Sequence, residues 1–179
     1  MFFGKKVGWK SASDRFAKFS EFCYNFPKLC LKFGGSSLAS ASQLEKVLHI
    51  VKSDAERRFV VVSAPGKRDD QDTKVTDALI KYYRQYIAGN DVSKEQNWII
   101  KRYSDMVSEL GLKSAIIEKI SKSIISLATL PIENNEFLYD TFLAAGENNN
   151  AKLIAAYFNH NDIPARYVHP REAGLVVSS

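Results

Sequence analysis

Hydrophobic residues follow two different spacings along this chain. Residues 28–33, KLCLKF, and residues 58–63, RFVVVS, are short apolar runs of strand length, and the second is rich in the β-branched residues that strands favour. Elsewhere the apolar positions recur every three or four residues, as on one face of a helix. This spacing predicts helices over residues 42–54, 73–89 and 93–130, the last of them interrupted at Gly111.

The last third of the chain continues in the same way. We expect one helix over residues 135–147, a second over 149–161, and a strand over PARYVH, residues 164–169. At the first predicted helix, Ser42 and Glu45 have the spacing of a capping box, in which each side chain bonds the other's backbone amide. Strands that alternate with helices predict an α/β fold with a mainly parallel sheet and helices on its faces.

The composition is that of a globular protein. Hydrophobic residues make up 45% and charged residues 25% of the 179 positions, which suits one domain or part of a larger one. No window approaches the roughly 18 consecutive apolar residues of a membrane span, and the first residues lack the apolar centre of a secretory signal. We therefore expect a cytoplasmic protein that does not bind membranes.

The net charge of +5 arises mostly in the first 29 residues. Six basic and two acidic side chains fall in residues 1–29, whereas the remaining 150 residues hold 19 basic and 18 acidic ones. The body of the chain is therefore nearly neutral and has no basic stripe, so we expect no nucleic-acid partner. We predict that the leader over residues 1–29 is poorly ordered.

The cysteines and histidines form no metal-binding pattern. Cys23 and Cys30 are separated by six residues, which is not a zinc spacing, and the three histidines are scattered along the chain. We expect reduced thiols and no metal held by this chain's own residues.

The stretch CLKFGGSSLAS combines the groups that a phosphate needs. Gly34 and Gly35 carry no side chain, so their backbone amides can approach an anion, and the helix that follows adds partial positive charge. Lys32 adds a full charge, and Ser36 and Ser37 can donate hydrogen bonds. The lysine precedes the glycines, so this is not a Walker loop. From this stretch alone, a phosphate cradle and a tight turn beside a surface lysine are equally acceptable.

The second predicted strand ends in similar chemistry. VVVSAPGKR, residues 60–68, finishes a buried strand with small residues and continues with Gly66 and Lys67. If the two strands pair in parallel, both glycine-containing stretches lie at the same edge of the sheet, where ligands bind in such folds. The alternative is a surface loop with a solvated lysine.

Three motifs taken together resemble aspartate kinases, which belong to the amino-acid kinase superfamily. The motifs are KFGGSS, VVVSAPGKR with DTKVTDALI, and AAGENNNAKLIAAYFNHNDIPARYVHPREAGL, and they occur in the family's order. The resemblance implies a carbamate kinase-like fold, a three-layer sandwich, of which residues 30–179 form the N-terminal, amino-acid-binding lobe. Residues 1–29 match nothing in the family.

The resemblance implies a phosphoryl transfer. Aspartate kinases move the γ-phosphoryl group of ATP, bound with Mg²⁺, to the side-chain carboxylate of L-aspartate, and the 4-phospho-L-aspartate formed feeds lysine, threonine and methionine synthesis. Lys32 matches the family's lysine at the transferring phosphoryl group, and its loss would cost about 10²–10³ in rate. The phosphate-binding loop of the family is matched by Gly34, Gly35, Ser36 and Ser37.

Three further residues match the family's amino-acid site. Ser63 and Thr76 correspond to hydroxyl groups that hold the substrate carboxylate, and Glu147 corresponds to the glutamate that pairs with the α-ammonium group. Without the family, Glu147 would be an acidic residue in the first turn of a helix, stabilised by the helix dipole. Lys67 and Asp77 are weaker candidates, because Lys67 can simply line the site and Asp77 can cap or pair on its helix.

Several segments of an aspartate kinase do not occur in this sequence. The family's R-G-G-S-D segment, its nucleotide-binding half and its ACT domains are absent from the 179 residues. We therefore expect the chain alone to turn over no ATP and to be marginally stable or to associate, and we expect the full-length form to be a homo-oligomer. Two alternatives stay open: a catalytically incompetent remnant or binding subunit of such a kinase, and a related kinase acting on glutamate or acetylglutamate.

Overall fold

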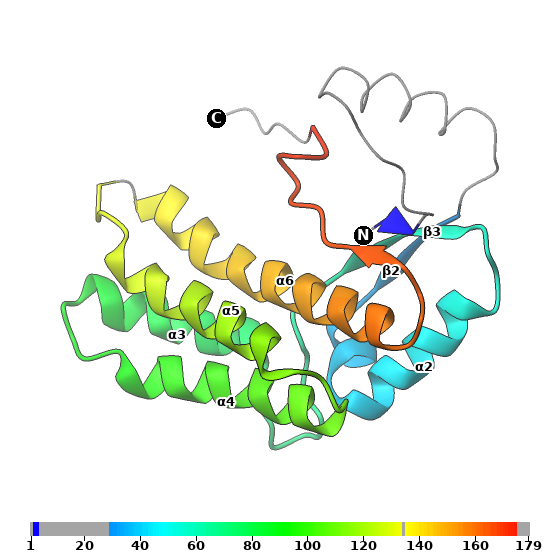
Figure 1. The fold of residues 1–179 in the computed structure, drawn as a ribbon. Coiled ribbons are helices and arrows are strands. Elements are labelled where there is room, and N and C mark those ends of the chain that lie inside the picture. The colour runs from blue at the N-terminus through cyan, green and yellow to red at the C-terminus, as the bar shows by residue number, and fades with distance from the viewer. Residues whose placement is uncertain (1, 4–28, 134, 175–179) are drawn as a thin grey trace.

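The computed structural model describes residues 2–3, 29–133 and 135–174, whose arrangement is shown in Figure 1. A four-stranded sheet lies on one side of the molecule, and long helices pack together on the other. Within the described residues the sheet has the order β2-β3-β1-β4. Its strands are β1 (Phe2–Phe3), β2 (Leu29–Phe33), β3 (Arg57–Val62) and β4 (Ala165–Arg166).

The two longer strands confirm the predicted parallel pairing. β2 and β3 run side by side, with Lys32 opposite Val61 and Phe33 opposite Val62, and α2 (Ala41–Lys52) lies in the connection between them. The ladder continues one residue beyond the strands, where the Ser63 amide donates to the Phe33 carbonyl at 3.2 Å. The segments that follow β2 and β3 therefore begin at the same edge of the sheet.

Two short strands extend the sheet, and one of them, β1, runs in the opposite direction to the other three. Phe2 lies opposite Phe59 of β3 and opposite Arg166 of β4, so β1 is antiparallel to both neighbours. The strand predicted over residues 164–169 is shorter than expected, because only Ala165–Arg166 pairs with β1. Residues 4–28 of the leader lie outside the described residues, so its predicted disorder stays a prediction.

α2 is capped two residues earlier than predicted. The side chain of Ser40, and not that of Ser42, accepts a hydrogen bond from the Gln43 amide, at 3.4 Å. The predicted capping box of Ser42 with Glu45 is wrong, because the helix has already begun at Ala41. Ser42 instead lies with its hydroxyl oxygen 2.9 Å from that of Ser40.

Four long helices of the described chain form the second part of the core: α3 (Val75–Ile87), α4 (Ser93–Glu109), α5 (Ser114–Ile125) and α6 (Asn135–His160). Figure 1 shows them side by side, with the end of α6 reaching the sheet. Gly111 separates α4 from α5 as predicted, with a φ of 65° that favours glycine. Two 3-10 turns, η1 (Gly35–Leu38) and η2 (Ser126–Thr129), complete the set of elements. The fully buried side chains that join the layers include Leu44, Leu79, Tyr82, Tyr103, Phe142, Leu153 and Phe158.

A single helix replaces the two that were predicted over residues 135–147 and 149–161. α6 is 26 residues long and passes through Gly146 without a break. A glycine inside a helix costs about 1 kcal/mol relative to alanine. At this position, however, a Cβ atom would lie 2.8 Å from the Cβ atom of Ala64 and 3.1 Å from Cδ1 of Leu79. Gly146 is therefore a close packing contact and not a helix end.

The continuity of α6 changes the reading of Glu147. This residue lies in the middle of the helix, so the alternative that places it in a first helical turn is wrong. None of the helices in the described part of the chain, α6 included, combines the length and the apolar character needed to cross a membrane.

Candidate functional site

The ammonium group of Lys32 lies beside Gly34. A Cβ atom added to Gly34 would lie 3.8 Å from Lys32 Nζ, and the lysine side chain is exposed at the end of β2. Lys32 makes no ion pair with any residue that the structure describes. Its charge is therefore available to an anionic ligand that approaches the glycines.

The first glycine loop, residues 34–38, has a different geometry from the one expected. Gly35–Leu38 forms the 3-10 turn η1, in which the Ser37 amide donates to the Gly34 carbonyl at 3.1 Å. α2 begins only at Ala41. The partial charge of that helix is therefore displaced from the loop, and affinity for an anion rests on Lys32 and on the loop's own amide and hydroxyl groups.

The second glycine loop, residues 63–68, touches the first through bare backbone. The Gly66 amide donates to the Gly35 carbonyl at 2.9 Å. A Cβ atom on Gly66 would lie only 2.6 Å from the Gly35 carbonyl carbon and 2.9 Å from the Ser36 nitrogen. Only glycine at position 66 allows this approach, so the two strand ends share one site.

The three residues that are predicted to bind the amino-acid substrate lie beside a second close contact. Gly146 of α6 meets Ala64 at 2.8 Å and Val75 of α3 at 3.7 Å, distances measured from a Cβ atom built on the glycine. Ala64, Val75 and Gly146 each have a predicted site residue as a chain neighbour, and these neighbours are Ser63, Thr76 and Glu147. The structure thus brings three segments, 63–64, 75–76 and 146–147, to one place.

Hydrogen bonds hold this contact from both sides. Asn150 of α6 is fully buried, and its side-chain amide donates to the Ser63 carbonyl at 2.7 Å. The Val75 amide, at the start of α3, donates to the Pro65 carbonyl at 3.1 Å. The second glycine loop is therefore tied to both α3 and α6.

The carboxylate of Glu147 lies near a buried tyrosine. Tyr103 of α4 donates its hydroxyl to the Gly146 carbonyl at 2.9 Å. Burial raises the pKa of this hydroxyl, and the neighbouring charge of Glu147 raises it further. Glu147 is half-buried and has no ion-pair partner among the described residues, so its charge is available to a cationic group.

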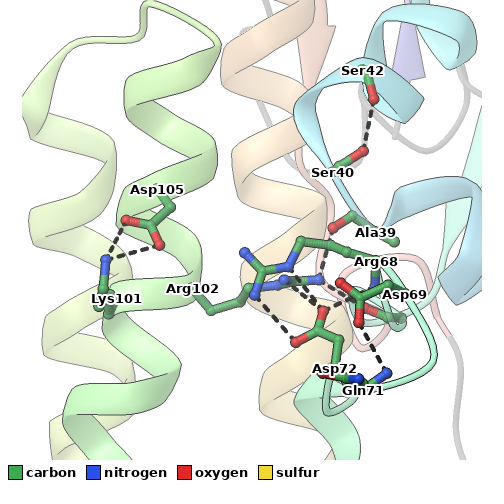
Figure 2. Close-up of polar contacts among 11 residues, drawn as sticks. Ala39, Ser40, Ser42, Arg68, Asp69, Gln71, Asp72, Lys101, Arg102 and Asp105 are labelled. Carbon is green, nitrogen blue, oxygen red and sulfur yellow. Dashed lines mark hydrogen bonds and ion pairs between the residues drawn. The ribbon is translucent and has the colours of Figure 1, made fainter.

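A buried arginine links the second glycine loop to Ala39, the residue after the first glycine loop, and the sequence motifs do not identify it. Arg102 of α4, with a side chain 2% exposed, donates from Nη2 to the carbonyls of Ala39 and Gly66, both at 2.8 Å. Its Nη1 donates to Asp72 Oδ2 at 2.9 Å. Figure 2 shows the guanidinium groups of Arg102 and Arg68 together at the Asp72 carboxylate, with Arg102 also reaching Ala39.

A family model described as the amino acid kinase family matches residues 27–179. The chain belongs to this family. It is 49% identical to Aspartokinase 3 of Bacillus subtilis (strain 168) over 149 residues, which are 83% of this chain and 33% of that protein. It is 27% identical to Aspartokinase 2, chloroplastic, of Arabidopsis thaliana over 156 residues, 83% of this chain and 27% of that one.

Solved structures of the amino acid kinase family are similar as well. An aspartate kinase from Clostridium acetobutylicum matches with a TM-score of 0.58 and 34% identity, over 72% of this chain and 28% of that one. These comparisons confirm the family resemblance and the α/β fold that the three motifs predict. The chain spans a third or less of the length of these relatives.

The two weaker candidates, Lys67 and Asp77, form no side-chain hydrogen bond or ion pair with the other candidate site residues that the structure describes. Lys67 and Asp77 are exposed, and neither forms an ion pair with another described residue. Among the described residues, no group of three or more histidine, cysteine or acidic side chains is arranged to hold a metal ion.

One sequence signal was available for Arg102. The helical spacing of α4 predicts only packing, yet Arg102 lies on the same buried face as Ile99 and Met106. Charged side chains are almost never fully buried unless they are paired. An arginine within an apolar stripe is therefore a sign of a buried polar partner, although the partner cannot be named from the spacing.

Because the loops touch through the backbone at Gly66, alanine should destabilise the fold at position 66 but not at position 34. Gly66→Ala should lower the free energy of unfolding by about 2–3 kcal/mol, because its Cβ atom overpacks against backbone that cannot move aside. Gly34→Ala is the matched control, since its backbone, with φ −80° and ψ 169°, suits alanine and its Cβ atom would meet only Lys32 Nζ. Urea denaturation of both variants checks this, and equal losses would contradict it.

The lowered pKa of Asp72 makes the free energy of unfolding depend on pH. Burial alone would raise the pKa of this carboxyl, but hydrogen bonds from Arg68 and the charge of Arg102 outweigh burial and hold the pKa well below its usual value. The stabilisation by ionised Asp72 is therefore present above its unfolded-state pKa of about 3.9 and is lost as the pH falls from there toward the folded-state pKa.

Asp72→Asn should lower the free energy of unfolding by about 3 kcal/mol at neutral pH, because it leaves Arg102 buried without its counter-charge. The difference from the unsubstituted chain should shrink as the pH falls below about 4. Asp105→Asn, which breaks the exposed pair with Lys101, is the control and should cost less than about 1 kcal/mol. A constant difference across this pH range would contradict the assignment.

Proposed function

We propose that this chain supplies the aspartate-binding and phosphate-binding part of an aspartate kinase. The reaction is transfer of the γ-phosphoryl group of ATP to the side-chain carboxylate of L-aspartate, which gives 4-phospho-L-aspartate. The 49% identity to Aspartokinase 3 supports this reaction. The observation that carries the proposal is the contact of Gly35 with Gly66, because donor and acceptor of a phosphoryl group must be held side by side.

The phosphoryl side of the reaction rests on Lys32 and the first glycine loop. The γ-phosphoryl group and the attacking carboxylate are both anionic, so catalysis depends mainly on positioning and charge neutralisation. Lys32 contacts the transferring group and offsets its charge, and the amides and hydroxyls of residues 34–37 bind phosphate oxygens. Support comes from the ammonium, which lies beside Gly34 and has no ion pair among the described residues.

The amino-acid side rests on the three residues around Gly146. Glu147 pairs with the α-ammonium group of L-aspartate, and the hydroxyls of Ser63 and Thr76 hold its carboxylate. The position of all three beside one packing contact supports these roles. The substrate then lies between a cation, Lys32, and an anion, Glu147, which match its side-chain carboxylate and its ammonium group.

Magnesium enters this reaction as part of the ATP complex. The described residues provide no acidic cluster for it, and Asp72, which is close to the loops, is already engaged by two arginines. Mg²⁺ bound through triphosphate oxygens with few protein ligands is the usual arrangement for ATP. The ion would neutralise phosphate charge together with Lys32.

The same proposal implies a cellular location and a set of partners for the reaction. 4-Phospho-L-aspartate is an acyl phosphate that feeds lysine, threonine and methionine synthesis, so we infer a cytoplasmic enzyme with small-molecule partners. The full-length form would be a homo-oligomer, and neither a membrane nor a nucleic acid takes part.

Calorimetric titration of the chain with L-aspartate tests the amino-acid site directly. Glu147→Gln should weaken binding by roughly tenfold or more, because a hydrogen bond to a charged group contributes about 1.5–3 kcal/mol. L-Glutamate should bind less well than L-aspartate, which separates this reaction from that of a glutamate kinase. Equal affinity for both amino acids, or no effect of Glu147→Gln, would refute the proposal.

The phosphate site has its own titration, with ATP and Mg²⁺. Lys32→Ala should weaken ATP binding while leaving L-aspartate binding within about twofold, because the lysine serves the phosphoryl group. Lys119→Ala, at an exposed position of α5, removes the same charge away from the loops and should change neither titration.

A further inference from the structure

Arg102 links the second glycine loop to Ala39, the residue that directly follows the first glycine loop. It enters from α4, and its Nη2 atom donates to the carbonyl of Ala39, directly after η1, and to the carbonyl of Gly66. Gly66 is consequently held on both sides of its own backbone. Its amide is bonded to Gly35 and its carbonyl is bonded to Arg102.

The guanidinium is itself held in a fixed orientation. Asp72 accepts from Arg102 Nη1 at 2.9 Å, and the same carboxylate accepts from Arg68 Nε at 2.9 Å and from the Arg68 amide at 2.9 Å. Arg68 follows Lys67 at the end of the second glycine loop. The carboxylate thus joins the arginine of α4 to the loop that the arginine contacts, as Figure 2 shows.

Stability alone is a poor explanation for this arginine. Burying a guanidinium carries a large desolvation cost, and an apolar side chain of similar size would often serve the core as well or better. The neighbours Ile99 and Met106 on the same face are apolar, and Arg102 Nε is buried without a partner. What arginine adds is a rigid planar fork whose donors point in set directions.

We propose that Arg102 is a positioning residue of the phosphoryl transfer, which sets the distance between the two glycine loops. It touches neither ATP nor L-aspartate. It acts through the carbonyls of Ala39 and Gly66, which hold the Lys32 side of the site against the Ser63 side. The catalytic part of this inference rests on the proposed function, whereas the loop-spacing part does not.

Hydrogen exchange of the backbone amides tests the loop spacing without any ligand. Arg102→Lys keeps a cation for Asp72 but loses the planar guanidinium fork. The backbone amides at residues 34–38 and 63–68, Pro65 excepted, should therefore exchange roughly tenfold faster, while the exchange of core amides of α6 stays unchanged. Arg102→Met should show the same loop effect, and Arg84→Lys, at an exposed position of α3, should show none.

The outcomes separate the two parts of the inference. Faster exchange in α6 and the loops alike would mean that Arg102 only stabilises the fold, and normal loop protection in Arg102→Lys would mean that the fork is not needed; either result overturns the proposal. If Arg102→Met does not fold, Arg102→Lys decides alone.

Ligand affinity then tests the link to catalysis. Because the two loops are held less firmly in the Arg102→Lys variant, its affinity for ATP should fall roughly tenfold at a temperature where the variant is folded. Unchanged ATP affinity together with faster loop exchange would overturn the positioning role. If the unsubstituted chain does not bind ATP, that result would instead count against the proposed function. Hydrogen exchange would then still test whether Arg102 sets the loop spacing.

Discussion

The backbone contact between Gly35 and Gly66 is the constraint on which the rest of this structure depends. Parallel pairing of β2 and β3 places the two loops at the same sheet edge, but only the absence of a side chain at Gly66 lets them touch. The neighbouring helices are arranged around that contact. Arg102 of α4 donates a hydrogen bond to the Gly66 carbonyl. Gly146 of α6 packs against Ala64, two residues before Gly66.

Charges near the loops divide into two groups. Arg102 and Asp72 are buried and bonded to one another, and Arg68 completes their pairing, so these charges are used by the fold. Lys32 and Glu147 carry opposite charges and form no ion pair with described residues, so they remain for ligands. The proposed site for a phosphoryl group and an amino acid needs this division, because an unpaired arginine would compete for the same anions.

Local patterns predicted the strands at β2 and β3, their parallel pairing and most helices, because these follow from short-range periodicity. They failed where a distant contact decides the outcome. Two helices are predicted over residues 135–147 and 149–161, yet α6 runs through both without a break. Gly146 within it packs against Ala64, which fills the space that a side chain would take. Motif resemblance named Lys32 and Glu147 as candidate site residues, and their roles stay predictions. It did not name Arg102, because the acceptors of that side chain lie 36 and 63 residues away along the chain.

The proposed function requires the two loops, which touch at Gly35 and Gly66, to form one site with the phosphate at the first loop and the amino acid beside the second. Titration of the isotope-labelled chain with ATP and Mg²⁺, followed by backbone amide chemical shifts, tests it most directly. The largest shift changes are predicted at residues 34–37 and at Ala64, Gly66 and Lys67, in both loops at the same ligand concentration. Changes confined to one loop, or concentrated in the basic residues of the leader, would contradict it.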